Sequence, residues 1–196
     1  MRKQKFVIDT SALTGLSAKK PAIKRHILLL IELISKAKKK GIVCYTPPSV
    51  WKEMKGLLEN KKIPAKEIKR LDAWLVQKSV CKDELKVPCE FLYEYISEVR
   101  QRFGKGLREA EKAVLSVGGN RPDPVVIGEL RDKFKKAMRQ GLVDSIEDLD
   151  VLMLAKELDA GIVAKDEGIK KWAKHWGIRF IDGESFPVLL KEYLKK

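Results

Sequence analysis

Hydrophobic and polar positions in the first sixty residues follow two alternating patterns. Lys5–Asp9 (KFVID) is a short apolar run typical of a buried strand, and Ile42–Tyr45 (IVCY) is a second run of β-branched and aromatic residues. Between them, the spacing from Pro21 to about Lys39 predicts an amphipathic helix, which a glycine closes. A pair of prolines at positions 47 and 48 suits the first turn of the next helix. This alternation predicts parallel strands joined by right-handed crossovers.

The middle of the chain has a different pattern, because nearly all of residues 64–140 show helical periodicity. Residues 88–117 predict one long helix, in which Gly104–Gly106 is the expected point of interruption. The segment GGNRPDP (Gly118–Pro124) breaks the pattern, and residues 125–141 predict a second helix. Two helices with a tight connection form an antiparallel hairpin.

The strand and helix alternation resumes after this excursion. Residues 146–159 predict a helix, GIVAKD (Gly161–Asp166) a strand, EGIKKWAKHWG a helix and IRFID a strand, before a closing helix. The expected fold class is therefore α/β, a three-layer sandwich with a central parallel sheet of about four strands. Residues 1–63 and 141–196 are expected to form this domain, and residues 64–140 an inserted helical subdomain that contains the hairpin.

The charge balance indicates the kind of partner. Among 196 residues, 41 are Lys or Arg and 27 are Asp or Glu, which gives a formal net charge of +14. Such an excess favours binding to nucleic acid through phosphates, although a lysine-rich, heat-adapted surface is the alternative interpretation. The start of the chain does not look like a signal peptide, and the longest apolar run, Ile27–Ile34, is too short to cross a bilayer. We therefore expect a cytoplasmic protein with no membrane partner.

Acidic residues from separate segments are expected at one edge of the sheet. Two predicted strands end in an aspartate, and the carboxyl ends of parallel strands form the edge at which ligands bind. A glutamate lies about one and a half turns into the helix after the second strand, and three aspartates surround the start of the helix that precedes the later strand. These candidate metal ligands are Asp9, Glu53, Asp144, Asp148, Asp150 and Asp166.

Each acid has a structural explanation when it is considered alone. Ser145 and Asp148 resemble a helix N-cap pair, and an aspartate after a strand is a common turn residue. The whole set is harder to explain, because carboxylates packed together repel and raise one another's pKa, a cost that a divalent cation removes. Oxygen ligands without matching His or Cys favour Mg²⁺, with Mn²⁺ as the alternative, over zinc. A metal-activated water could then hydrolyse a phosphodiester without a protein nucleophile.

Spaced motifs along the whole chain resemble a known family. FVIDTSAL (Phe6–Leu13), Glu53, Asp148–Leu158 and Gly161–Asp182 resemble the PIN-domain metal-dependent ribonucleases. Together with the inserted helices, the segments VPCEFLYEYISEVRQRFGKGLREAE and LRDKFKKAMRQGLVDSIEDLD are similar to the minimal, protein-only ribonuclease P family of prokaryotes, whose members are also described as RNA ligase partner proteins.

This resemblance implies a PIN-like sandwich and the removal of 5′ leaders from precursor tRNA, with a 5′ phosphate left on the mature tRNA. It implies catalytic metal ligands at Asp9, Asp144, Asp148, Asp150 and Asp166, whereas Glu53 matches the second acid of the wider PIN pattern. Ala164 departs from that pattern, since many PIN domains have Ser or Thr two residues before the later aspartate. No small-molecule cofactor beyond the metal is implied. A homo-oligomer that assembles through the inserted helices is implied, and the apolar stripe in FLYEYISEV agrees with it, although packing on its own domain explains the stripe equally well.

Basic residues recur along both helices of the excursion. We interpret them as an RNA-binding surface that recognises phosphates and 2′-hydroxyl groups, with solvated helix decoration as the alternative. The predicted RNA-binding residues are Arg100, Arg102, Lys105, Arg108, Lys112, Lys133, Lys136 and Arg139. Two other functions stay open from the sequence: a PIN-domain ribonuclease of another specificity (a toxin or an rRNA-processing enzyme), and a non-catalytic RNA-binding partner of an RNA ligase.

Overall fold

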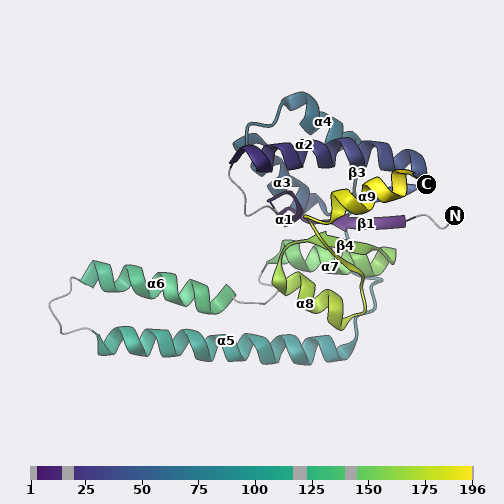
Figure 1. Ribbon diagram of the computed structural model, residues 1–196. Helices are drawn as coiled ribbons and strands as arrows, with labels where there is room; N and C mark the ends of the chain where they lie inside the picture. The colour runs from purple at the N-terminus through teal and green to yellow at the C-terminus, as the bar shows by residue number, and fades with distance from the viewer. Residues whose placement is uncertain (1–3, 15–19, 117–122, 140–144, 196) are drawn as a thin grey trace. The chain divides into compact units, whose positions relative to one another are not determined.

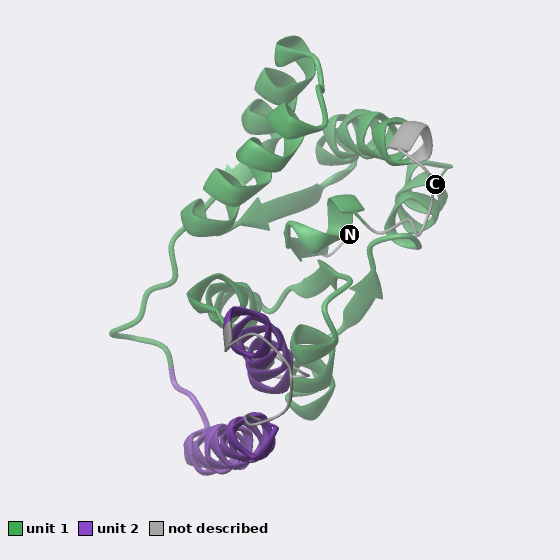
Figure 2. Cartoon of the chain, turned by 90° about the vertical axis from the view of Figure 1, so that its left-hand side faces the viewer, with its two compact units in different colours: residues 1–85, 145–196 green, residues 86–144 purple. Residues whose placement is uncertain are grey.

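The computed structural model describes residues 4–14, 20–116, 123–139 and 145–195. The chain divides into two compact units, one formed by Met1–Leu85 with Ser145–Lys196 and the other by Lys86–Asp144 (Figure 2). We call them the sheet unit and the hairpin unit, and each is described by itself.

The sheet unit contains a five-stranded, fully parallel sheet. Its strands are β1 (Gln4–Ile8), β2 (Ile42–Thr46), β3 (Leu75–Gln77), β4 (Gly161–Ala164) and β5 (Phe180–Asp182), in the order β3-β2-β1-β4-β5. The central strand β1 pairs with β2 on one side and with β4 on the other, so that Phe6 lies between Cys44 and Gly161. The strand order reverses between β1 and β4, which is the position where parallel α/β sheets bind ligands at their carboxyl edge.

Helices cover both faces of this sheet. On one face, α2 (Lys20–Ala37) contacts α4 (Ala65–Trp74) and α9 (Phe186–Lys195), and on the other α7 (Ile146–Leu158) contacts β1, β4 and α8 (Glu167–His175) (Figure 1). The remaining elements are α1 (Ser11–Thr14), the 3₁₀ helix η1 (Lys38–Lys40) and α3 (Pro48–Asn60). None of the helices in the described ranges is long and apolar enough to cross a membrane.

The double cover explains why the central strands are apolar on both sides. Phe6, Val7 and Ile8 in β1, and all four residues of β4, are buried. The Phe6 ring meets the Phe186 ring of α9 edge to face, with 5.2 Å between centroids. Continuous apolar runs of this kind are typical of parallel strands between two helical layers, as the sequence predicted.

The sheet has five strands, where the sequence predicted about four. Leu75–Gln77 pairs in parallel with β2, and α4 leads directly into it. A strand of three residues is too short to show a periodicity of its own, and it follows a helix without a break. Residues 64–85, assigned from the sequence to the inserted subdomain, therefore group with the sheet unit instead.

The hairpin unit consists of two helices, α5 (Cys89–Leu115) and α6 (Asp123–Arg139). The expected interruption of α5 at Gly104–Gly106 does not occur. Gly106 is instead buried against α6, and a Cβ atom there would lie 2.6 Å from the Phe134 ring. The glycine therefore permits close helix packing.

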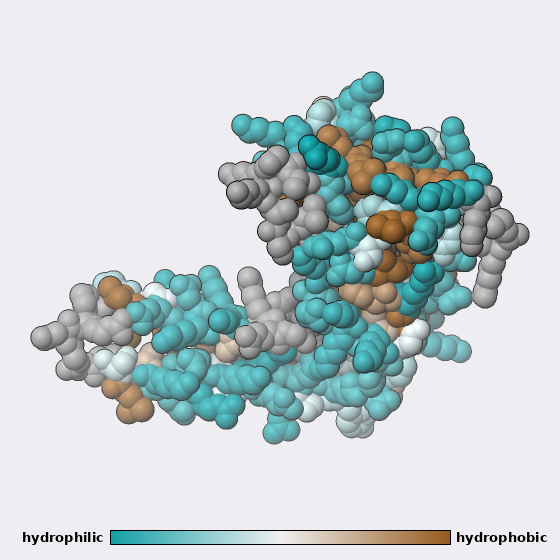
Figure 3. Space-filling view, in the orientation of Figure 1, coloured by the Kyte–Doolittle hydropathy of each residue, from teal (hydrophilic) through white to brown (hydrophobic). Residues whose placement is uncertain are grey.

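Figure 3 shows hydrophobic side chains where α5 ends and α6 begins, and Leu115 is 86% exposed there.

Candidate functional site

Asp9 occupies the carboxyl end of the central strand. Its backbone N–H donates to the Val163 carbonyl at 3.0 Å, which extends the pairing of β1 with β4 by one residue. The side chain is 5% exposed, and its Oδ2 accepts hydrogen bonds from the Ser11 backbone N–H at 2.8 Å and from the Ser11 hydroxyl. The turn after β1 therefore fixes the carboxylate at the sheet edge.

Burial raises the pKa of Asp9 above its usual value. The hydrogen bonds from Ser11 and Thr10 lower the pKa of this carboxyl, and the nearby negative charge of Glu53 raises it further. An ionised Asp9 therefore carries an uncompensated desolvation cost, which a bound cation would relieve.

Helix α3 carries Glu53, and through Ser49 it also contacts Asp150 of α7 at the same edge. Thr10 Oγ1 donates to Glu53 Oε2 at 3.1 Å, and Ser49 Oγ donates to Asp150 Oδ2 at 3.0 Å. Ser49 and Glu53 are four residues apart, so they lie on one face of α3. Residues that follow β1, begin α3 and begin α7 thus converge, although Ser49 and Asp150 are 101 positions apart in the chain.

Asp166 lies at the same edge, after β4. Its Oδ1 accepts a hydrogen bond from the Ile169 backbone N–H at 2.9 Å, so Asp166 caps α8 as a structural residue would. The preceding Lys165 backbone N–H donates to the Ser11 hydroxyl at 2.8 Å. Ser11 therefore links the turn of Asp9 to the loop of Asp166.

The acids at the start of α7 do not all have the same position. The backbone N–H of Asp148 donates to the Ser145 hydroxyl at 3.0 Å, which confirms the predicted N-cap. Asp148 and Asp150 are two residues apart, so they project from different sides of α7, and the carboxylate of Asp150 accepts the hydrogen bond from Ser49 of α3. Asp144 lies outside the described residues. No three of the described candidate acids have carboxylate oxygens within 4.8 Å of one another.

Several residues of this edge were not predicted from the sequence. Ser49 could have been found from the sequence, because it lies one helical turn before Glu53. No local pattern points to Lys82, which belongs to the segment after β3. Its Nζ lies 3.7 Å from Asp150 Oδ1. Glu157 anchors this segment, since it accepts the Cys81 backbone N–H at 2.9 Å and pairs with Lys78 at 2.7 Å.

A sequence profile of PINc domain ribonucleases matches residues 5–195 of this chain. The chain belongs to the PINc domain ribonuclease family. Curated relatives named RNA-free ribonuclease P cover it almost completely. The Haloarcula marismortui protein is 40% identical over 98% of this chain and 92% of its own length, and the Methanocaldococcus jannaschii protein is 39% identical over 100% and 94%. The Archaeoglobus fulgidus protein is 40% identical over 98% and 92%. The resemblance predicted from the sequence is confirmed.

The acidic edge of this PINc domain ribonuclease fits a divalent cation, whose use is general in PIN nucleases. Asp9, Glu53, Asp150 and Asp166 offer hard carboxylate oxygens, which suit Mg²⁺ and Mn²⁺. The buried Asp9 adds a physical reason, because its ionised form needs a positive partner.

The hairpin unit of this ribonuclease gathers most of the predicted RNA-binding residues into one groove of about 390 Å³ between α5 and α6. The predicted residues that line it are Lys105, Arg108, Lys112, Lys133 and Lys136. Their contact with RNA stays a prediction. Arg100 is exposed outside the groove lining, and the side chain of Arg139 is not among those described.

Arg102 has a different position from its neighbours on α5. It is 8% exposed, and its Nη1 donates to the Met138 carbonyl of α6 at 3.1 Å. This contact holds the two helices of the hairpin together, so the structure favours a packing role for Arg102 over the predicted contact with RNA.

Proposed function

We propose that this protein is an RNA-free ribonuclease P, a metal-dependent endoribonuclease that removes 5′ leaders from precursor tRNA and leaves a 5′ phosphate. The observation that carries the proposal is the convergence of four acids on the carboxyl edge of the sheet, where the strand order reverses between β1 and β4. These acids are Asp9, Glu53, Asp150 and Asp166. The names of relatives that match nearly the whole chain supply the substrate.

The metal is proposed to be Mg²⁺, with Mn²⁺ as a substitute. When bound, it activates a water and neutralises charge on the phosphate. Asp9 and Asp150 are proposed as its principal ligands, because the Ser11 and Ser49 donors fix one oxygen of each carboxylate. Asp166 keeps its Oδ2 available while Oδ1 caps α8. Asp148 in the first turn of α7 and Asp144, which precedes this helix in the sequence, are further proposed ligands or water-positioning groups.

The basic groove of the hairpin unit is proposed to hold the tRNA backbone. Its cations come from positions 105, 108 and 112 of α5 and from positions 133 and 136 of α6, so each helix presents them along one face. Contacts of this kind recognise the shape of folded RNA through phosphates rather than through bases.

The hairpin is also proposed to assemble the protein into a homo-oligomer. Exposed apolar residues recur along α5 at intervals of four and seven, which places them in one stripe of the helix. These residues are Leu92, Ile96, Phe103, Leu107 and Val114, each between 55% and 70% exposed. Light scattering of wild type and of a Phe103→Glu variant tests this proposal, which requires the variant to have a smaller mass.

The test of the function is cleavage of a precursor tRNA with a labelled 5′ leader, first in Mg²⁺ and then in EDTA. We expect one metal-dependent cut, at the mature 5′ end, and a 5′ phosphate on the product. An Asp72→Asn variant serves as the matched control, because Asp72 is an exposed aspartate of α4, remote in sequence from every candidate ligand.

Other outcomes would replace the proposal with a specific alternative. Cuts in the anticodon loop or in ribosomal RNA would indicate a PIN ribonuclease of another specificity. Binding of precursor tRNA without cleavage in Mg²⁺, and without cleavage when Mn²⁺ replaces it, would indicate a non-catalytic RNA-binding protein.

A further inference from the structure

A cavity among the described residues lies away from the acidic edge. It has a volume of about 440 Å³ and lies at the opposite edge of the sheet, where β1 and β4 begin and the loop into β5 passes. Lys5 in its lining is four positions from Asp9, which corresponds to about 13 Å along an extended strand. The cavity is therefore separate from the proposed metal site.

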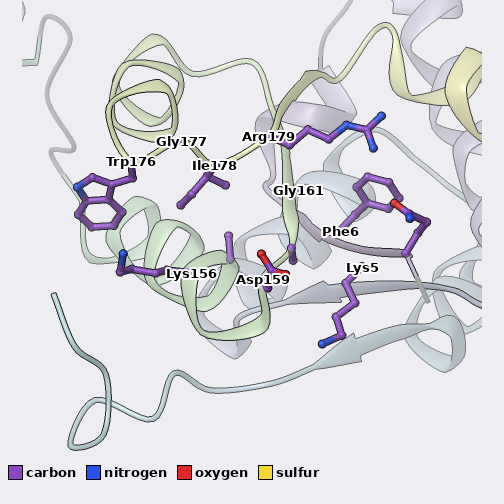
Figure 4. A pocket seen from close by; sticks show the side chains of 12 residues that line it. Lys5, Phe6, Lys156, Asp159, Gly161, Trp176, Gly177, Ile178 and Arg179 are labelled. Atoms are coloured by element: carbon purple, nitrogen blue, oxygen red, sulfur yellow. The ribbon is translucent and has the colours of Figure 1, made fainter. Parts of the chain in front are cut away.

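Three cationic side chains line this cavity. Lys156 and Trp176 lie at one end, Arg179 and Phe6 lie at the other, and Asp159 and Lys5 lie between them (Figure 4). Lys156 Nζ is 5.2 Å from the Trp176 ring centroid, and the Arg179 guanidinium carbon is 5.8 Å from the Phe6 ring centroid. Lys5 Nζ donates to the Leu158 carbonyl at 3.0 Å. Each cation is thus held in place by an aromatic ring or a carbonyl.

Helix capping explains only part of this arrangement. Lys5 and Lys156 lie at the carboxyl end of α7, where a cation offsets the helix dipole. Arg179 belongs to no helix and donates to the Tyr193 hydroxyl at 3.4 Å. In the described part of the chain, no carboxylate lies within ion-pair distance of these three cations.

The remaining charge of the cavity is positive. Three unit positive charges face the single carboxylate of Asp159 and the carboxyl ends of α7 and α8, each worth about half a negative charge. Roughly one net positive charge remains inside a concave site. The volume is in the range of pockets that bind ligands of nucleotide size.

We propose that this cavity is a binding site for a phosphate-bearing ligand of nucleotide size. The combined positive charge of Lys5, Lys156 and Arg179 attracts the phosphate, and the aromatic rings at both ends form the apolar part of the site. The ligand is a nucleoside phosphate, either free or as one unit of an RNA strand. The site needs no metal, so it does not depend on the nuclease function.

The experiment follows the indole N–H signals of the ¹⁵N-labelled full chain in EDTA. Four tryptophans give four signals, and a Trp176→Phe variant assigns the one at the cavity. The protein is titrated separately with AMP, with pyrophosphate and with a 5′-phosphorylated RNA trinucleotide. We expect a saturable shift of the Trp176 signal, with affinity about tenfold weaker in Lys156→Gln and Arg179→Gln, since a lost charged contact costs roughly that factor.

A Lys66→Gln variant is the matched control, because Lys66 is an exposed lysine of α4 and its loss changes the net charge equally. Response to AMP or pyrophosphate assigns the site to free phosphate ligands, and response to the trinucleotide alone assigns it to an RNA strand. No shift up to roughly 10 mM of any ligand overturns the proposal. Equal weakening in Lys66→Gln overturns it too, because binding would then follow net charge rather than the cavity. The retained indole pattern of each variant reports that it is folded.

Discussion

In the sheet unit, acidic side chains from four separate segments reach one edge, whereas in the hairpin unit the cations of two helices line a groove by local periodicity. The acids depend on long-range contacts, such as the bond between Ser49 and Asp150 across 101 positions. The cations depend on the helical repeat, with the two helices held together around Gly106 and Arg102.

This contrast has a consequence for how each region tolerates change. Each of the four acids in the described ranges has its own position and its own hydrogen-bond donor, so no neighbouring residue can replace it. The groove contains five cations, one of which, Lys112, pairs with the Glu109 carboxylate of the lining at 2.6 Å, so the loss of one cation leaves most of the attraction for a polyanion. We therefore expect changes of the acids to abolish activity and changes of the cations to reduce binding by degrees.

The largest effect is expected from Asp150→Asn. Loss of a charged metal ligand removes several kcal/mol of transition-state stabilisation, so the single-turnover rate constant for precursor tRNA cleavage should fall by about a thousandfold or more. The dissociation constant for precursor tRNA should stay nearly unchanged, because the groove is intact. Single-turnover cleavage and filter binding measure the two quantities, with Asp72→Asn as the control. Normal cleavage by Asp150→Asn would remove this residue from the site.

A smaller and graded effect is expected in the hairpin. The double variant Arg108→Ala/Lys136→Ala should bind precursor tRNA about tenfold more weakly, and the slope of log K against log salt should fall by roughly one per lost phosphate contact. The matched control is Arg131→Ala/Lys135→Ala, whose side chains are exposed on α6 outside the groove lining. Equal weakening by both double variants would show that only net charge matters.

A further prediction concerns Lys82, a cation of the sheet unit that lies next to one of the acids of the proposed metal site. Its ammonium lies 3.7 Å from Asp150 Oδ1 and competes with a cation for that carboxylate. Lys82→Ala should therefore lower the Mg²⁺ concentration for half-maximal cleavage. The pair is largely exposed on the lysine side and worth at most about 1 kcal/mol, so we expect a shift of about two- to fivefold. Lys86→Ala, four positions further along the chain and the first residue of the hairpin unit, should leave this Mg²⁺ concentration unchanged.

The sequence predicted those features that depend only on a residue's immediate neighbours in the chain. Strand-end aspartates at positions 9 and 166 and the N-cap pair of Ser145 and Asp148 could be placed because strand ends and helix starts are local features. β3 could not be predicted, since three residues carry no period. The contact of Lys82 with Asp150 and the burial of Arg102 depend on the path of a loop and on helix packing, which local patterns do not specify.

The smallest effect is a change in thermal stability, which we expect for Asp9→Asn in the absence of metal. Burial raises the folded-state pKa of Asp9, so the stability that this group contributes is present below its unfolded pKa and is lost as the pH rises through the folded value. At pH 7 in EDTA, the ionised carboxylate therefore costs stability, and asparagine removes the charge while still accepting from Ser11. We expect Asp9→Asn to have a Tm a few degrees above wild type under these conditions, and no advantage near pH 3.8. Mg²⁺ should raise the Tm of wild type more than that of the variant, because it binds the ionised site. A lower Tm for Asp9→Asn in EDTA at pH 7 would mean that the carboxylate is already compensated by the protein and does not need a cation.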